Sequence, residues 1–397
     1  MLERSLEHLI PKLSAGYPGV ALVGPRQSGK TTLAKKIWPS HRYVTLESLD
    51  WREQARTDPR GLLRDLGDNV ILDEIQRVPE IFNFLQEWLD EGNHHAVLTG
   101  SEQFLLMQGV SQTLAGRVAH FELQPLGWSE RMGVPRREPW QALRGELAGS
   151  KPTESTAEIL HRGLYPRIHD KQLNAHRWLD DYVRTYVERD VRSLSQVADL
   201  AQFSLMLRLL ATQSGSLLNQ ATLATQVGVS IPTVRRWIAI LETSGIVFLL
   251  QPHHANLGKR LIKSPKPYFV DSGLLCLLLG IRDPSHLVSH PMRGHVFENF
   301  VVSEFRKLFF HNGLRPSLYF WRDSNGLEID LLAEEGADLL PIEIKSTATW
   351  RTDLASSIKK WLQLAGRPDE PGLVVYDGDD VHQGTSSIKT APWWRLL

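Results

Sequence analysis

Cysteine is almost absent from this sequence of 397 residues, which contains only Cys276, inside the apolar run GLLCLLLG. A single cysteine excludes a disulfide framework within the chain and favours a buried thiol in a reducing compartment. No uninterrupted apolar run reaches the roughly 18 residues of a membrane span. The opening MLERSLEHLIPKL lacks the apolar core and cleavage site of a signal peptide. We therefore expect a cytoplasmic protein without a membrane partner.

The sequence also lacks an excess of charge of either sign, since 45 basic residues balance 45 acidic ones. This balance removes any global electrostatic argument for nucleic-acid binding and leaves only local clusters to be considered. Internal repeats and low-complexity tracts are missing as well. The hydrophobic fraction of 42% and the charged fraction of 23% are those of an ordinary globular protein. A chain of this length is expected to form about two or three domains with sizeable cores.

Short apolar segments alternate with helix-like stretches in residues 1–132, which we assign to one domain. The five segments are GVALVG (19–24), RYVTLE (42–47), NVILDE (69–74), HAVLTG (95–100) and VAHFELQPL (118–126). Strands that alternate with helices predict an α/β fold with a parallel sheet covered on both faces.

The remainder of the chain divides by composition into three regions. Residues 133–218 begin with a polar stretch rich in proline and glycine and continue as a mostly helical region. Residues 219–280 have the pattern of a winged helix, and residues 290–397 that of a separate α/β unit with a helix followed by short strands.

The segment from Gly24 to Thr31 reads GPRQSGKT and fits the phosphate-binding pattern G-x-x-x-x-G-K-[ST]. It follows a predicted strand and opens a predicted helix, which is the context that the pattern requires. The glycines allow backbone N–H groups to surround phosphates, and the helix N-terminus adds its dipole. Lys30 is expected to reach the β- and γ-phosphates, and the Thr31 hydroxyl to bind Mg²⁺. The predicted ATP-binding residues are Gly24, Pro25, Arg26, Gln27, Ser28, Gly29, Lys30, Thr31 and Thr32.

Two further strand ends add polar groups to this predicted site. The third strand ends in Asp73 and Glu74. Asp73 can hold Mg²⁺ through water, and Glu74 can polarise the attacking water, although solvated acids at a strand end are the alternative. Thr99 and Ser101, at the end of the fourth strand, could sense the γ-phosphate or orient the water. Ordinary strand-end capping explains those two equally well.

Two arginines are candidates for an arginine finger. Arg117 precedes the fifth strand, and Arg189 lies in YVERDV. Either could act on its own P-loop or on that of a neighbouring subunit. A structural salt bridge is the competing explanation for both.

The winged-helix pattern begins with a short helix that breaks at Gly228, after which Ser230 can cap a second helix. On that helix Arg235 and Arg236 avoid the apolar face, which consists of Val234, Trp237, Ile238 and Leu241. Residues 226–267 contain six Lys or Arg and one acid, a local charge that favours phosphate contacts. The predicted DNA-binding residues are Arg235, Arg236, Lys259, Arg260 and Lys263. A packing or protein-binding role for the winged helix remains the alternative.

Four polar residues in the last region suggest a metal site. Glu298 lies on the apolar face of the helix GHVFENFVVSEFRKLFF. A carboxylate is unusual at such a position unless it has a functional role. Asp330 lies in the strand LEIDLL, and Glu343 and Lys345 share a face of the strand LLPIEIKS. Carboxylates on two adjacent strands can hold Mg²⁺, with Glu298 completing the set and Lys345 activating water or stabilising phosphate charge. The E-x-K pattern alone is weak, but its order after the helix glutamate and the strand aspartate is moderately specific.

Together these motifs resemble a large family of prokaryotic AAA-type ATPases whose C-terminal domain looks like a PD-(D/E)xK nuclease. The resemblance rests on GPRQSGKTTL, VILDEIQRVPE, LTGSEQFLL, LAGR, LQPLGWSE, RGLYPRI, YVERDV, YFVDSGLL, GHVFENFVVSEF, LEIDLL and PIEIKS. It implies an ATPase core, a winged helix and a nuclease-like domain in that order. It also implies nucleotide roles for Lys30, Thr31, Asp73 and Glu74, and metal-site roles for Glu298, Asp330, Glu343 and Lys345.

From these observations we expect an ATPase that uses ATP and Mg²⁺ to remodel or translocate on DNA, either duplex or branched. It would act as a homo-oligomer, with a hexamer as one option, and its nuclease-like domain would grip or cut the DNA. The alternative is a nucleotide-dependent switch that controls a protein partner and has a non-catalytic C-terminal domain. DNA-stimulated ATP turnover would distinguish the two.

Overall fold

The computed structural model describes residues 2–101, 106, 109–110, 113–186, 200–253, 264–383 and 387–397. Contacts divide the chain into two units. The first comprises residues 1–126 with the short segments 243–245 and 310–314, and the second comprises the remainder. Of the residues selected from sequence, Arg189, Lys259, Arg260 and Lys263 lie outside the described residues. In the part of the chain that the structure describes, no helix combines the length and the hydrophobicity of a membrane span.

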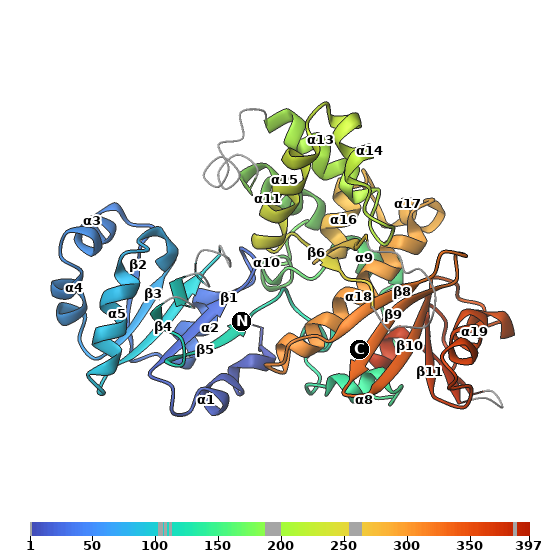
Figure 1. Ribbon diagram of the computed structural model, residues 1–397, viewed down its shortest axis with the longest axis horizontal. Helices are drawn as coiled ribbons and strands as arrows, with labels where there is room; N and C mark the ends of the chain where they lie inside the picture. Colours follow the sequence, from blue (N-terminus) through green and yellow to red (C-terminus); the bar gives the residue numbers. More distant parts are fainter. Residues whose placement is uncertain are drawn as a thin grey trace. The chain divides into compact units, whose positions relative to one another are not determined.

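A five-stranded sheet forms the first unit (Figure 1). Its strands are β1 (Gly19–Val23), β2 (Arg42–Thr45), β3 (Asn69–Asp73), β4 (His95–Gly100) and β5 (Val118–Glu122). The order is β2-β3-β4-β1-β5, and every neighbouring pair is parallel. The predicted parallel α/β sheet is confirmed. Because the strands are parallel, their carboxyl ends share one edge, and the P-loop leaves β1 there.

Helices cover both faces of this sheet. They are η1 (Ser5–Glu7), α1 (Ile10–Leu13), α2 (Lys30–Ile37), α3 (Leu49–Thr57), α4 (Pro59–Leu66), η2 (Ile75–Arg77) and α5 (Ile81–Asp90). Successive side chains of β1 alternate between two cores, as the pleat requires. Val20 and Leu22 pack with η1, α1 and α2, whereas Ala21 and Val23 pack with α3, α4 and α5. Burial on both faces explains why β1 reads as a continuous apolar run.

The second unit begins with short helices. These are α7 (Trp128–Met132), α8 (Pro139–Leu143), α9 (Thr156–Arg162), α10 (Pro166–Asp170), α11 (Ala175–Tyr186) and α13 (Leu200–Ala211). The predicted helical character of this region is confirmed in the described residues. The polar stretch before α9 is not a free linker, because the Arg137 guanidinium donates to the carbonyl of Arg395 at 3.0 Å. A Cβ on Gly149 would lie 1.7 Å from the Trp394 carbonyl oxygen, so only glycine fits there.

A helix–turn–helix and a hairpin follow, in the predicted order. The elements are α14 (Gln220–Val227), α15 (Ile231–Thr243), β6 (Val247–Leu250) and β7 (Lys266–Phe269). Gly228 ends α14 in the left-handed conformation at a φ of 77°. The Ser230 hydroxyl accepts from the Thr233 N–H at 3.2 Å and so caps α15. The predicted apolar face of α15 is buried.

A mixed six-stranded sheet with helices completes the second unit. The helical elements are α16 (Ser272–Leu278), α17 (Pro284–Ser289), α18 (Arg293–His311), η4 (Thr352–Ala355), α19 (Ser356–Leu364) and α20 (Trp393–Leu396). The strands are β8 (Leu318–Arg322), β9 (Glu328–Glu335), β10 (Asp338–Lys345), β11 (Gly372–Tyr376), β12 (His382–Gln383) and β13 (Ile388–Pro392). Their order is β12-β13-β11-β10-β9-β8. The pair β9–β10 is antiparallel, and β10–β11 is parallel.

The β6–β7 hairpin joins this sheet through backbone hydrogen bonds. The N–H of His253 donates to the carbonyl of Phe320 at 2.7 Å, and the N–H of Phe320 donates to the carbonyl of Gln251 at 3.1 Å. On the other side of the hairpin, the Gly215 N–H donates to the Pro267 carbonyl at 3.0 Å. The hairpin and the C-terminal sheet therefore belong to one unit, and the domain boundaries given above stay a prediction.

Candidate functional site

The loop after β1 needs glycine at two positions. Gly24 has a φ of 144°, and a Cβ there would lie 2.1 Å from the Leu123 carbonyl oxygen. Gly29 has a φ of 97° and directly precedes α2. Gln27 is also left-handed, with a φ of 64°, and Thr32 is exposed on the first turn of α2. The backbone thus has the close approach and the left-handed turns on which a phosphate-binding loop depends.

Lys30 points back into this loop. Its ammonium donates to the carbonyls of Gly24 at 2.9 Å and Pro25 at 2.8 Å. The side chain is 6% exposed. Burial lowers the pKa of Lys30 to about 8, against the carboxylates of Glu74 and Asp73, which raise it. An incoming phosphate would compete with the loop carbonyls for the ammonium and would favour its charged form.

Asp73 collects three hydroxyl donors at the end of β3. Its Oδ1 accepts from Thr31 Oγ1 at 3.0 Å and from Thr99 Oγ1, and its Oδ2 accepts from the Tyr43 hydroxyl at 2.8 Å. Thr31 and Asp73, which the sequence assigns to one cation, therefore lie within hydrogen-bond distance. An adjacent hydroxyl and carboxylate beside a phosphate loop fit Mg²⁺, which prefers oxygen ligands.

Glu74 adopts the left-handed conformation, with a φ of 55°, which is uncommon for a residue other than glycine. Its Oε2 accepts from Ser101 Oγ at 2.9 Å and from Gln76 Nε2 at 2.6 Å. Both donor side chains are buried. The structure thus brings Ser101 to Glu74, which leaves the role predicted for Ser101 open, and adds Gln76, which sequence reasoning missed.

The first candidate finger, Arg117, lies at the opposite edge of the sheet. It precedes β5, whose amino end pairs in parallel with the amino end of β1, whereas the P-loop follows the carboxyl end of β1. Its guanidinium donates to both carboxylate oxygens of Asp90, at 2.6 and 2.8 Å. A role of Arg117 at its own P-loop is therefore wrong. A role at a neighbouring subunit stays a prediction.

Sequence reasoning also missed Arg4. Its guanidinium donates to the carbonyl of Ser28, inside the P-loop, at 2.6 Å and to the carbonyl of Gln124, after β5, at 2.7 Å. Arg4 is 6% exposed. Arg4 thus links the P-loop backbone at Ser28 to the segment after β5. No pattern in the sequence around Arg4 predicts this role.

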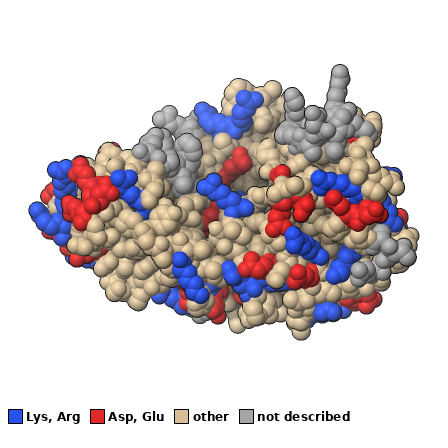
Figure 2. All heavy atoms as spheres, turned by 60° about the horizontal axis from the view of Figure 1, so that its bottom comes forward, with Lys and Arg blue, Asp and Glu red and all other residues tan. Residues whose placement is uncertain are grey.

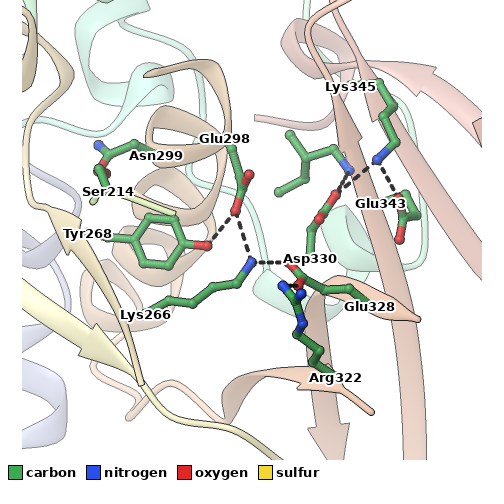
Figure 3. A network of polar contacts seen from close by, with 11 residues as sticks. Ser214, Lys266, Tyr268, Glu298, Asn299, Arg322, Glu328, Asp330, Glu343 and Lys345 are labelled. Carbon is green, nitrogen blue, oxygen red and sulfur yellow. Dashed lines mark hydrogen bonds and ion pairs between the residues drawn. The ribbon is translucent and has the colours of Figure 1, made fainter. Parts of the chain in front are cut away.

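A second polar cluster lies in the second unit (Figure 3). Asp330 Oδ2, on β9, accepts from the Ile344 N–H at 2.8 Å and lies 3.4 Å from the Lys345 ammonium. That ammonium lies 2.5 Å from Glu343 Oε2. Glu343 is 1% exposed, and its Oε1 has no hydrogen-bond partner among the described residues. Burial and Asp330 raise the pKa of Glu343, against Lys345, which lowers it. Asp330, Glu343 and Lys345 therefore lie next to one another, as the sequence predicts.

Glu298 has other partners than the sequence suggests. Its Oε1 accepts from the Tyr268 hydroxyl at 2.6 Å and lies 3.5 Å from the ammonium of Lys266. Lys266 in turn lies 2.5 Å from Glu328 Oε1, and Arg322 lies 2.6 Å from Glu328 Oε2. Burial raises the pKa of Glu298 above its usual range.

The predicted three-carboxylate metal set is therefore not what the structure shows. Within the described ranges, no three Asp, Glu, His or Cys side chains are grouped so that they could hold a metal ion. The physical reason is that Lys266 and Lys345 divide the acids between them. Glu328, two residues before Asp330 on the same strand face, was the signal that sequence reasoning overlooked.

Arg235 and Arg236 are both exposed on α15. Neither guanidinium has a hydrogen bond or ion pair with the residues that the structure describes. On the face of the molecule shown in Figure 2, basic and acidic side chains are intermixed, in keeping with the zero net charge. Both arginines therefore point toward solvent, as the sequence predicts.

Family models support this description of the site. One described as an AAA domain matches residues 17–132. Two domains of unknown function, DUF8612 and DUF4143, match residues 153–285 and 293–396. With the P-loop geometry above, the AAA match defines residues 17–132 as a P-loop ATPase domain of the AAA type, which implies nucleotide binding.

The uncharacterized protein Rv2008c of Mycobacterium tuberculosis is 33% identical to this chain over 387 residues, which cover 96% of the chain and 81% of the relative. The uncharacterized protein Mb2031c of Mycobacterium bovis matches with the same values. The chain belongs to the family of these proteins.

Solved structures show weaker likeness. The Walker-type ATPase PABY2304 of Pyrococcus abyssi is 15% identical with a TM-score of 0.45, covering 70% of this chain and 96% of its own. The Aeropyrum pernix Orc1 protein in complex with DNA is 14% identical with a TM-score of 0.30, covering 69% of this chain and 91% of its own. Likeness of this extent carries no information on what this chain binds.

Proposed function

We propose that the chain is an ATPase whose turnover is coupled to duplex or branched DNA bound at α15. The observation that carries the proposal is the pair of exposed arginines, Arg235 and Arg236, on the second helix of a helix–turn–helix. Such a helix can enter the major groove, with the first helix lying across the backbone. Arginine suits the task because its planar guanidinium donates in pairs to phosphate oxygens or guanine.

The charge around these arginines supports the same proposal. Between residues 200 and 253 the sequence has three basic residues, Arg208, Arg235 and Arg236, and one acidic residue, Glu242. Arg208 is exposed as well. Glu242 is partly buried, and burial raises the pKa of its carboxyl. The described helices therefore present more positive than negative charge to solvent, which is the footprint of a phosphate-binding surface.

In the nucleotide site, each residue of this proposal has one role. Lys30 would neutralise the β- and γ-phosphates, and Glu74 would accept a proton from the attacking water. Thr31 and Asp73 would hold Mg²⁺, which offsets phosphate charge when bound. Ser101 would orient the Glu74 carboxylate.

The proposal includes a homo-oligomer, with a hexamer as one option. Hydrolysis by P-loop enzymes gains from an arginine that stabilises transition-state charge. Because Arg117 faces away from its own P-loop, it would serve the site of a neighbour, and Arg189 remains a second candidate for that role.

The C-terminal domain would contact DNA rather than cut it. The nuclease-like order of Glu298, Asp330, Glu343 and Lys345 supports a related fold, and the mixed sheet places Asp330 and Glu343 on adjacent strands. Cleavage is not proposed, because a second ammonium, that of Lys266, lies beside Glu298 and no three acids of the described residues are grouped so that they could hold a metal ion.

The test is ATP turnover with and without duplex and branched DNA, at several salt concentrations. DNA should raise kcat of the wild type, and Arg235→Ala with Arg236→Ala should remove this stimulation while leaving turnover without DNA unchanged. Lys359→Ala with Lys360→Ala is the matched control, because these two cations are also neighbours on an exposed helix face, on α19. Turnover that no DNA alters would refute the proposal and favour the nucleotide-dependent switch.

A further inference from the structure

Lys266 is the first residue of β7 and is almost completely buried, with 1% of its surface exposed. Its ammonium lies 2.5 Å from Glu328 and 3.5 Å from Glu298, and 5.3 Å from the centroid of the Phe320 ring. A buried ammonium is tolerated only where carboxylates or aromatic faces replace its hydration. The hairpin thus inserts a fixed positive charge into the carboxylate cluster of the C-terminal sheet.

The acids around Lys266 come from two elements. Glu298 belongs to α18, and Glu328 and Asp330 share one face of β9 (Figure 3). Although burial lowers the pKa of Lys266, these carboxylates together raise it above its usual value, so the ammonium keeps its charge. Oxygen atoms from two chain segments therefore converge on a nitrogen cation.

The cations of the cluster offset most of its negative charge. The four carboxylates are those of Glu298, Glu328, Asp330 and Glu343, and the three cations are Lys266, Lys345 and Arg322. A hard dication needs several anionic or carbonyl oxygens that are free to approach it, and carboxylates that already lie beside ammonium or guanidinium groups attract it weakly.

The backbone next to Lys266 is fixed by a hydrogen bond and by close packing. The residue after it, Pro267, accepts from the Gly215 N–H at 3.0 Å. Gly215 is left-handed with a φ of 74°, and a Cβ there would lie 3.2 Å from Glu298 Oε1. This backbone therefore packs directly against Glu298, on the same side as the Lys266 ammonium.

We propose that Lys266 is the resident cation of the C-terminal carboxylate cluster, taking the place that a divalent metal ion would need. The carboxylates of the cluster are then held in place without a metal ion, and Lys266 acts as a positioning residue for Glu298 and Glu328. This inference does not depend on DNA binding or on coupling to ATP turnover, so its test is separate from that of the proposed function.

The experiment measures Mn²⁺ binding to the full-length, nucleotide-free protein. The wild type should bind Mn²⁺ no more tightly than its Asp330→Asn or Glu298→Gln variants. Lys266→Met should gain a Mn²⁺ site at least about tenfold tighter than any in the wild type, since carboxylate oxygens lose their internal cation. The double variant Lys266→Met with Glu298→Gln should lose that gain, and Lys266→Arg, which keeps the charge, should show none.

Two outcomes overturn the proposal. One is a wild-type Mn²⁺ site that Asp330→Asn or Glu298→Gln abolishes. The other is a folded Lys266→Met variant, judged by circular dichroism, that gains no Mn²⁺ site. If Lys266→Met does not fold, the decision falls to the wild type, whose thermal midpoint should not rise with Mn²⁺. A rise that Asp330→Asn removes would then refute a resident lysine cation.

Discussion

The buried Lys30 makes ATP affinity depend on pH in a range where ATP itself hardly titrates. Burial lowers the pKa of Lys30 to about 8 in the free protein. Phosphate oxygens beside the ammonium stabilise its charged form, so the pKa rises on binding. Between these two values the complex holds a proton that the free protein lacks. ATP affinity should therefore fall as the pH rises through 8.

The magnitude follows from the free protein alone. At pH 7 about nine tenths of Lys30 is charged, whereas at pH 9 only about one tenth is, so ATP should bind roughly tenfold more weakly at pH 9. That ratio corresponds to about 1.4 kcal/mol. Below pH 7 the affinity should no longer depend on this group.

Isothermal titration calorimetry measures both the affinity and the proton. A non-hydrolysable ATP analogue avoids turnover while keeping the Glu74 carboxylate, which itself raises the pKa of Lys30, and two buffers of different ionisation enthalpy reveal proton uptake. We expect close to one proton per ATP at pH 9 and almost none at pH 7. A dissociation constant that is flat from pH 7 to 9, with no proton uptake, would show that Lys30 is fully charged in the free protein and would refute the reasoning.

Further predictions concern other residues of the two sites. Glu74→Gln should bind ATP normally and lose hydrolysis, because the carboxylate is the proposed base; normal turnover would show that the base is elsewhere. Arg4→Met leaves two buried carbonyls without their donor. Hydrogen bonds to charged groups contribute about 1.5–3 kcal/mol, so ATP affinity should fall at least about tenfold, with kcat at saturation little changed and Arg4→Lys intermediate. Replacing both Arg235 and Arg236 by alanine should reduce the salt slope of DNA binding by about 1.8, at about 0.9 per phosphate contact, and an unchanged slope would place DNA elsewhere. In the Glu343→Gln variant, the free energy of unfolding should fall less steeply with rising pH than in the wild type. Burial raises the folded pKa of Glu343 above the value of 4.5, so the unfolded chain releases this proton first and the free energy of unfolding falls as pH rises from there. Thermal midpoints between pH 4 and 8 measure this, and identical curves for both proteins would contradict it.

Local patterns were sufficient for much of the structure. The P-loop combines one strand, one glycine-rich turn and one helix, so its residues are neighbours in sequence. Asp330, Glu343 and Lys345 were predictable because β9 and β10 are consecutive and alternation fixes the face of each side chain. The position of Arg117 was also readable in principle, because a residue before a parallel strand lies at the amino edge, away from the phosphate loop.

Contacts between distant segments were not predictable in this way. Arg4 reaches Gln124 across 120 residues of sequence, and Lys266 reaches Glu328 across 62. For Glu298, the apolar helix face indicated that the carboxylate is mostly removed from solvent, but not which groups offset the cost of that burial. The partner of Glu298 is Lys266, which lies on the β6–β7 hairpin before α18. The sequence pattern of α18 carries no signal of this partner, so sequence reasoning counted Lys266 only as part of the local positive charge.

The hydrogen bonds between the β6–β7 hairpin and β8 have a thermodynamic consequence. The hairpin carries Lys266 and follows α15 directly, so the position of this helix and the charge state of the carboxylate cluster belong to one equilibrium. If a ligand on α15 displaces the hairpin, Glu298 loses Lys266 as its counter-ion and binds a proton more readily. Linkage is reciprocal: acidification that favours the protonated carboxyl of Glu298 must change the affinity of α15 for its ligand by the same factor. Proton uptake on ligand binding would thus report hairpin movement without any structural probe.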